Sequence, residues 1–194
     1  MFKRILVPLD GSRLAETALP YAEELAGAFD SEVTLIGVSE PRESQYLHMH
    51  QLYIEKMAEL VRSHIKEGTR VKVKPVSLVG EPAQEIINYA EKNNISLIAM
   101  TTHARSGMMP WTMGSIANRV LHRISMSVLL IRAKVPSQKV GKGGMFNKIL
   151  IPMDGSEAGE AVLRYIRELS KKLGSEVILL QVVAQGQHIH TVGG

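Results

Sequence analysis

The 194-residue chain contains no cysteine, which excludes disulfide bonds and thiolate zinc sites and is typical of a protein of the reducing cytoplasm. No stretch approaches the roughly 18 to 20 apolar residues that span a membrane as a helix. The first residues, MFKRILVPLDGS, reach an aspartate after a short apolar run, so they lack the core of a signal peptide and should form a strand. We therefore expect a cytoplasmic protein that does not bind membranes.

Aromatic residues are scarce, at 5%, and the net charge is a modest +4. The basic residues are scattered, and they form no stripe interleaved with aromatic side chains of the kind that binds nucleic acid. We therefore do not expect nucleic acid as a partner. The proportions of hydrophobic residues, 45%, and charged residues, 22%, are those of a globular protein. The length allows one domain and part of a second.

Strand and helix patterns alternate over the first 132 residues. Apolar runs of strand length occur at 4–9, 32–39, 71–78, 95–101 and 127–132. Helical spacing of apolar residues occurs at 13–29, 43–68, 80–94 and 115–124, and in the second of these the buried stripe is expected to include Leu52, Met57, Leu60, Val61 and Ile65. The alternation predicts an α/β fold, with a five-stranded parallel sheet covered by helices on both faces, but not its strand order. The third strand, in which valine alternates with lysine before a proline, should be an edge or half-exposed strand, and the fifth should be terminal.

The beginning of the chain is repeated near its end. FKRILVPLDGS at 2–12 corresponds to FNKILIPMDGS at 146–156, and SEVTLIGV at 31–38 to SEVILLQV at 175–182. An offset of 144 residues that holds without a gap over this length indicates an internal duplication. We expect a complete domain at 1–133, a linker at 134–145 and an incomplete β-α-β repeat at 146–194. The second copy is a truncated piece, a docked half-domain or a unit completed by another chain.

The segment TTHARSGMMPWTMGS, residues 101–115, connects the fourth strand to the fourth helix. Strand-to-helix loops lie at the carboxyl edge of an open α/β sheet, where ligands bind. The helix that follows begins with Gly-Ser, so free backbone N–H groups are available there to an anion. The position and composition of this loop therefore predict a phosphate site.

Three motifs in sequence order, ILVPLDGS, VGEPAQEII and THARSGMMPWTMGSIANRVL, together resemble those of the universal stress protein family. The resemblance covers residues 2–133 and, as the first part of a second copy in a tandem arrangement, 146–183. It implies a Rossmann-like sheet of the adenine-nucleotide-binding type, a cytoplasmic role in the stress response, and homodimers. It also implies that ATP or AMP binds in one branch of the family and not in the other.

In the nucleotide-binding branch this loop has the pattern Gly-x-x-Gly, nine residues, then Gly-Ser or Gly-Thr. The chain keeps the spacing with Thr101, Ala104 and Gly114-Ser115, but Thr101 and Ala104 replace glycines. Where the pattern requires close backbone approach or a positive φ, such a side chain costs about 1 kcal/mol. In the same loop, Arg105 is either a phosphate ligand or a solvated loop arginine, Gly107 offers a second flexible point, and Ser115 is a phosphate donor or a simple helix cap.

Residues near the ends of the first two strands would complete the site. By the resemblance, Asp10 lies near the ribose or binds Mg²⁺ together with phosphate oxygens; alternatively it shapes the Asp-Gly-Ser turn or caps the first helix. Pro8 and Val38 would be walls of an adenine pocket, although Val38 also fits an ordinary core position. These assignments predict a regulatory nucleotide-binding protein with at most slow ATP hydrolysis, because no general base is evident in the loop.

The remaining candidate residues give weaker indications of a functional site. His103 has no identifiable nucleophile beside it, and His48 and His50 are two apart on a helix, so their side chains diverge. His188 and His190 would make a weak metal site at best. The loop residues Met108, Met109, Trp111 and Met113 form either a surface for a protein partner or packing over the sheet edge or a dimer interface. The alternative function is accordingly a dimeric interaction protein that binds no nucleotide.

Overall fold

The computed structural model describes residues 1–65, 68–102, 113–132 and 144–182. The chain divides into two compact units, Met1–Met145 and Phe146–Gly194, each of which is described by itself. No helix among the described residues is long and apolar enough to cross a membrane.

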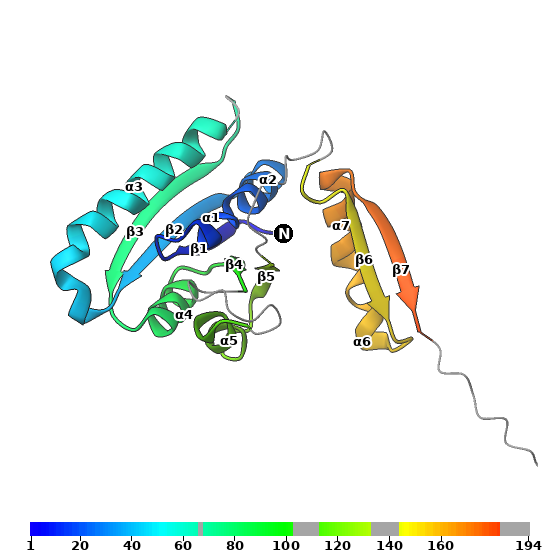
Figure 1. The fold of residues 1–194 in the computed structure, drawn as a ribbon. Helices are drawn as coiled ribbons and strands as arrows, with labels where there is room; N and C mark the ends of the chain where they lie inside the picture. Colours follow the sequence, from blue (N-terminus) through cyan, green and yellow to red (C-terminus); the bar gives the residue numbers. More distant parts are fainter. Residues whose placement is uncertain (66–67, 103–112, 133–143, 183–194) are drawn as a thin grey trace, which may run out of the picture. The chain divides into compact units, whose positions relative to one another are not determined.

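The first unit contains the predicted five-stranded parallel sheet (Figure 1). Its strands are β1 (Arg4–Leu9), β2 (Glu32–Ser39), β3 (Lys72–Val79), β4 (Leu97–Thr101) and β5 (Ser127–Ile131), in the order β3-β2-β1-β4-β5. The third and fifth strands occupy the two edges, as expected from their sequences. The first strand is central and pairs with β2 on one side and β4 on the other. The chain direction along the sheet therefore reverses at β1, which places a crevice at the carboxyl ends of β1 and β4.

Helices cover both faces of this sheet (Figure 1). They are α1 (Arg13–Glu16), α2 (Leu19–Phe29), α3 (Leu47–His64), which follows a 3₁₀ turn at Pro41–Tyr46, α4 (Pro82–Lys92) and α5 (Ser115–Leu121). α2 and α3 pack on one face and α4 and α5 on the other. On the second face, strand residues Leu6, Ile36 and Ile98 pack against Ile86, Ala90 and Val120 of the helices. Burial on both faces explains why the central strands are nearly continuous apolar runs.

Two predicted helices differ from those observed. The helix expected at 13–29 is interrupted, because Pro20 in the first turn of α2 has no N–H to continue α1 and its ring would clash with the carbonyl of Glu16. The hydroxyl of Thr17 donates to Leu14 at 2.7 Å where α1 ends. The helix expected from 43 begins as the 3₁₀ turn and becomes α-helical at Leu47.

The expected buried stripe of α3 was wrong in most of its members. The buried residues are Ile54, Ala58 and Val61, whereas Leu52 and Leu60 are 50% and 43% exposed. The observed stripe has spacings of four and three residues, which place it on one face of the helix. Ala58 brings α3 close to the sheet, and only Val61 belongs to both the predicted and the observed stripe.

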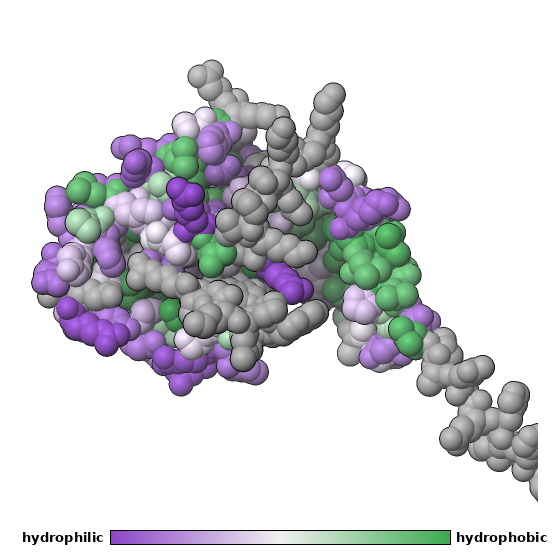
Figure 2. Space-filling model, viewed as in Figure 1, coloured by the Kyte–Doolittle hydropathy of each residue, from purple (hydrophilic) through white to green (hydrophobic). Residues whose placement is uncertain are grey.

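The second unit is a β-α-β arrangement of β6 (Lys148–Met153), α6 (Glu157–Glu160), α7 (Leu163–Leu173) and β7 (Glu176–Gln181). β6 and β7 pair in parallel from Lys148 opposite Glu176, the same register as Arg4 opposite Glu32 in the first unit, shifted by 144 residues. Most of its apolar side chains are exposed, and Figure 2 shows them as a hydrophobic surface on this unit. They include Leu150, Tyr165, Ile178, Leu179 and Leu180.

Candidate functional site

The turn after β1 is built from Asp10, Gly11 and Ser12. A carboxylate oxygen of Asp10 accepts the N–H of Ser12 at 2.9 Å, and the hydroxyl of Ser12 accepts the N–H of Ala15 at 3.2 Å and caps α1. Gly11 has a φ of 80°, in the left-handed region that favours glycine. Asp10 thus shapes the turn, one of the two roles expected from the sequence, and its exposed carboxylate lies at the carboxyl edge of the sheet.

The same turn recurs in the second unit as Asp154, Gly155 and Ser156. Asp154 accepts the N–H of Ser156 at 2.9 Å and its hydroxyl at 2.7 Å, and Gly155 has a φ of 78°. The hydroxyl and the N–H of Ser156 hold the pKa of Asp154 below its usual value. Because the turn forms in both units, local sequence is sufficient to specify it.

A pocket lies over the carboxyl ends of β1 and β4, where the sheet direction reverses. It contains about 620 Å³ of space that is open to solvent, and its walls are largely apolar. The strands contribute Pro8, Leu9, Ile36, Val38, Met100 and Thr101, the loop after β1 contributes Asp10, and the helices contribute Ala15, Pro82, Ile86, Gly114, Ile116 and Ala117. Largely apolar walls with a few polar groups, here Asp10 and Thr101, are typical of sites for small organic ligands.

Val38 offers a backbone carbonyl to this pocket. Successive residues of a parallel strand direct their N–H and C=O groups alternately to the two neighbouring strands. In β2, the N–H of Glu32 donates toward the β1 side at 2.9 Å, and the carbonyl of Ser39 accepts from the β3 side at 3.0 Å. Val38 therefore faces β1, whose pairing ends at Leu9. No described residue donates a hydrogen bond to the Val38 carbonyl, which is left as an acceptor beside the end of β1.

A second pocket of about 940 Å³ adjoins the first and shares Leu9, Asp10, Val38 and Pro82 with it. Its other walls are Gly11, Gly37, Glu40, Met49, His50, Tyr53 and Ile54. The two pockets are therefore neighbours at the ends of β1 and β2.

Two hydrogen bonds hold His50 and Tyr53 in the lining of this second pocket. The hydroxyl of Ser39 lies 2.7 Å from Nδ1 of His50, and the hydroxyl of Tyr53 donates to Glu16 at 3.0 Å. Burial, followed by the Glu16 carboxylate, raises the pKa of Tyr53 above its usual range, so Tyr53 remains a neutral donor. No group of three or more metal-ligating side chains occurs among the described residues.

Five of the residues predicted from the sequence line the first pocket together: Pro8, Asp10, Val38, Thr101 and Gly114. Ser115 does not line it; Ser115 is the first residue of α5, and Gly114 is the cap residue. Ala104, Arg105 and Gly107 lie outside the described residues, as do His103, Met108, Met109, Trp111, His188 and His190.

The predicted strain at Thr101 is absent. Thr101 is the last residue of β4 and pairs with Ile131 of β5, so its backbone is extended. The non-glycine residues with positive φ in the described part of the chain are Asp30 and Asn94. A threonine at 101 therefore carries no left-handed penalty, and only its side chain affects the space in the pocket.

The sequence did not reveal the walls that come from α4 and α5. Pro82 and Ile86 are four residues apart and share a helical face, and Ile116 follows Gly114 by two residues. Their helical spacing could be recognised in the sequence, but that spacing does not show that these side chains line the pocket. The contribution of His50 and Tyr53 to the adjoining pocket was missed for the same reason.

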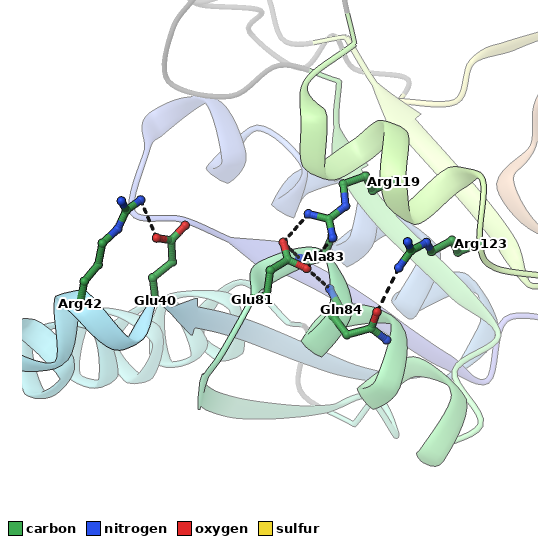
Figure 3. A network of polar contacts seen from close by, with 7 residues as sticks. All are labelled: Glu40, Arg42, Glu81, Ala83, Gln84, Arg119 and Arg123. Atoms are coloured by element: carbon green, nitrogen blue, oxygen red, sulfur yellow. Dashed lines mark hydrogen bonds and ion pairs between the residues drawn. The ribbon is translucent and has the colours of Figure 1, made fainter.

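A polar network joins α4 to α5 on their exposed side (Figure 3). The carboxylate of Glu81 caps α4 by accepting the N–H groups of Ala83 and Gln84 at 3.3 and 2.9 Å. The two terminal nitrogens of Arg119 donate to the two carboxylate oxygens of Glu81 at 2.7 and 2.9 Å. Slight desolvation acts to raise the pKa of Glu81, but the two backbone donors and the Arg119 guanidinium outweigh it and hold that pKa below its usual value.

Comparison with known proteins gives a consistent result. The profile of the universal stress protein family matches residues 1–132 and 145–188. Universal stress protein MJ0531 of Methanocaldococcus jannaschii is 32% identical over 141 residues, which cover 68% of this chain and 83% of the relative.

Solved structures agree with this fold. The structure of protein MJ0577, solved to assign its biochemical function, is 27% identical with a TM-score of 0.56 and covers 70% of this chain and 99% of its own. A universal stress protein from Archaeoglobus fulgidus, 23% identical with a TM-score of 0.68, covers 94% of this chain and 68% of its own. A universal stress protein in complex with cAMP is 17% identical with a TM-score of 0.52 and covers 68% of this chain and 97% of its own. The last two show the fold alone.

Proposed function

The chain belongs to the universal stress protein family, and we propose that it is a regulatory stress-response protein that binds an adenine nucleotide, ATP or AMP, at the carboxyl edge of its first sheet. The observation that carries this proposal is the apolar pocket at the reversal of the sheet, with the open carbonyl of Val38 in its wall. Ligands of open α/β sheets bind at such reversals.

The orientation of the base follows from the polar groups of the pocket. The Val38 carbonyl is an acceptor, so it favours a ring that presents an amino group, as adenine does, over one that presents a keto oxygen. Asp10 then lies at the same pocket edge as a partner for ribose hydroxyl groups. A single exposed carboxylate also suits Mg²⁺, which keeps most of its water ligands and is otherwise bound by phosphate oxygens.

The phosphates would extend toward Gly114 and the start of α5. The N–H of Gly114 donates to the carbonyl of Thr102 at 2.6 Å, so the next N–H groups, beginning with Ser115, are the ones oriented for an anion. We propose binding with at most slow hydrolysis. Asp10 is the acidic residue in the described lining, and it is held by the turn that it shapes.

The competing function is a dimeric interaction protein that binds no nucleotide. The replacement of the glycine expected at Ala104 favours this alternative. The extended backbone of Thr101 and the intact spacing to Gly114-Ser115 favour binding.

The two functions are distinguished by calorimetric titration of the nucleotide-stripped protein with Mg-ATP, AMP and IMP. We expect saturable binding of ATP and AMP, with IMP at least about tenfold weaker, because its keto oxygen would meet the Val38 carbonyl without a hydrogen bond. Equal affinity for AMP and IMP would contradict the orientation of the base. Absence of binding by all three would favour the interaction protein.

A substitution at Gly114 tests the position of the phosphates. Gly114 has a φ of −59°, which any residue adopts, so Gly114→Val adds methyl groups to the pocket lining without backbone strain. We expect ATP affinity to fall by more than about tenfold while the protein remains folded. Gly27→Val is the matched control, because a side chain at Gly27 of α2 meets no atom within 4 Å. Unchanged affinity in Gly114→Val would mean that the phosphates lie elsewhere.

A further inference from the structure

Glu81 and Arg119 connect two helices, α4 and α5, that both line the proposed nucleotide pocket. Pro82 and Ile86 of α4 form one wall, and Gly114, Ile116 and Ala117 at the start of α5 form another. Glu81 immediately precedes Pro82, and Arg119 is three residues after Ile116, one turn further along the helix. The contact between them is therefore close to both walls but on the exposed side of the helices (Figure 3).

The geometry of this contact restrains both partners. The Glu81 carboxylate is held by two backbone N–H groups of α4, and the planar guanidinium of Arg119 meets both of its oxygens. In the turn just after α5, Arg123 donates to the side chain of Gln84 at 3.0 Å. The first turn of α4 is thus attached both to α5 and to the turn that follows it.

α5 is a short helix with little buried surface, so contacts with α4 matter for its position. It spans seven residues, and its buried side chains are Ala117 and Val120, both of modest size. An exposed ion pair contributes little to global stability, and the side chains of Arg119 and Glu81 are 44% and 45% exposed. Its effect on the position of a short, lightly anchored helix is larger than its effect on unfolding.

We propose that Glu81 and Arg119 are positioning residues, which hold the start of α5 at a fixed distance from α4 and so set the width of the nucleotide pocket. The effect on ligand affinity rests on the proposed function, whereas the effect on the pocket walls does not. Neither side chain lines the pocket, so they act through Ile86 and Ile116. Loss of the contact allows these walls to separate and lowers the affinity for a flat ring between them.

The test uses the full chain with Arg119→Gln, Arg119→Lys, Glu81→Gln and the double variant Glu81→Gln/Arg119→Gln. Glutamine at 81 keeps an oxygen for the cap but loses the charge. Lysine at 119 keeps the charge but loses the second donor. Arg62→Gln is the matched control, because Arg62 ties α3 to the carbonyl of Val73 in β3 at 2.8 Å and does not line either pocket.

The first measurement is methyl NMR of Ile86 and Ile116 without ligand. We expect both signals to shift in Arg119→Gln, to shift less in Arg119→Lys and to remain in place in Arg62→Gln. The second measurement is AMP affinity, which should fall roughly threefold to tenfold in Arg119→Gln and in Glu81→Gln, and no further in the double variant that combines them. Urea unfolding of each variant checks that it is folded under the conditions of both measurements.

The outcomes separate the two proposals. Unchanged Ile86 and Ile116 signals in folded Arg119→Gln would overturn the positioning role, whatever the protein binds. If the wild-type chain binds no nucleotide, the proposed function is wrong, and the methyl signals still decide whether the contact sets the pocket walls. Additive losses of affinity in the double variant would also overturn the proposal, because the two residues would then act separately.

Discussion

Gly37 lies where α3 approaches β2 most closely. A Cβ atom at this position would be 2.7 Å from Cγ1 and 2.9 Å from Cδ1 of Ile54. Ile54 is only 1% exposed, so a Cβ atom at position 37 would force its side chain to shift within the packed contact between α3 and β2. The absence of a side chain at Gly37 therefore allows the helix to lie against the strand and leaves room for the pocket that both residues line.

Gly37→Ala should destabilise the protein by about 1 to 3 kcal/mol, because the added methyl group overpacks the contact with α3. Urea unfolding measures the change. Removing the opposing side chain in Gly37→Ala/Ile54→Ala should make the double variant less destabilised than the sum of the two single variants. Gly27→Ala, in the interior of α2 with open space around it, should be neutral or stabilising. Additive effects at Gly37 and Ile54 would show that they do not compete for the same space.

At the scale of elements, the strands were predictable because each is an apolar run between turn residues, and their parallel arrangement follows from the intervening helices. The strand order was not, because it depends on which strands pair, and residues close in sequence do not decide that. The boundary of α2 was missed although Pro20 marked it. The buried stripe of α3 was misassigned because Leu52 and Leu60 offer a second apolar stripe, and only the sheet selects between the two.

The candidate site divides in the same way. The residues at strand ends, Pro8, Asp10 and Val38, were predicted because the family resemblance assigned them to a nucleotide site and the strand pattern placed them at the carboxyl edge. The pocket wall from α4 and the ion pair between Glu81 and Arg119 were not predicted, because they depend on tertiary contacts. Glu81 and Arg119, for example, are 38 positions apart in the sequence.

The edge strand β5 carries a testable consequence for assembly. It contains no charged residue, and Val128, Leu129 and Leu130 are half-buried. The carbonyl of Ile131 accepts from Thr102 on the β4 side, so by alternation the N–H of Leu130 points to the free edge. We propose that a second copy of the chain pairs at this edge, as the family resemblance implies.

Leu130→Pro should convert the dimer to a monomer, because proline removes the outward N–H without removing a hydrogen bond to β4. Size-exclusion chromatography with light scattering measures the mass. Leu130→Ala loses similar packing but keeps the N–H, so it should remain dimeric. A wild-type chain that is monomeric at all concentrations, or a Leu130→Pro variant that is still dimeric, would disprove pairing at this edge.

At the scale of the whole molecule, nearly identical sequences occupy different environments. β1 and β6 read RILVPL and KILIPM, yet Leu6 is fully buried, whereas Leu150, its counterpart, is 57% exposed. The counterpart of Gly37 is Gln181, so the second copy lacks the glycine that admits α3 in the first. We propose that 1–133 is a complete domain, 134–145 a linker and 146–194 an incomplete repeat. In the described part of the second unit, β6 and β7 pair only with each other.

Hydrogen exchange compares the two copies directly. Their similar strand sequences give similar intrinsic exchange rates, so a large difference in protection reports tertiary context. A two-stranded sheet is at best marginally stable in water. We therefore expect amides of peptide 146–156 to exchange at least about a hundredfold faster than those of peptide 2–12, through local opening of the second unit. Equal protection would mean that the exposed face of β6 and β7 is covered in solution. A dependence of this protection on protein concentration would then show that a second copy of the chain covers the face.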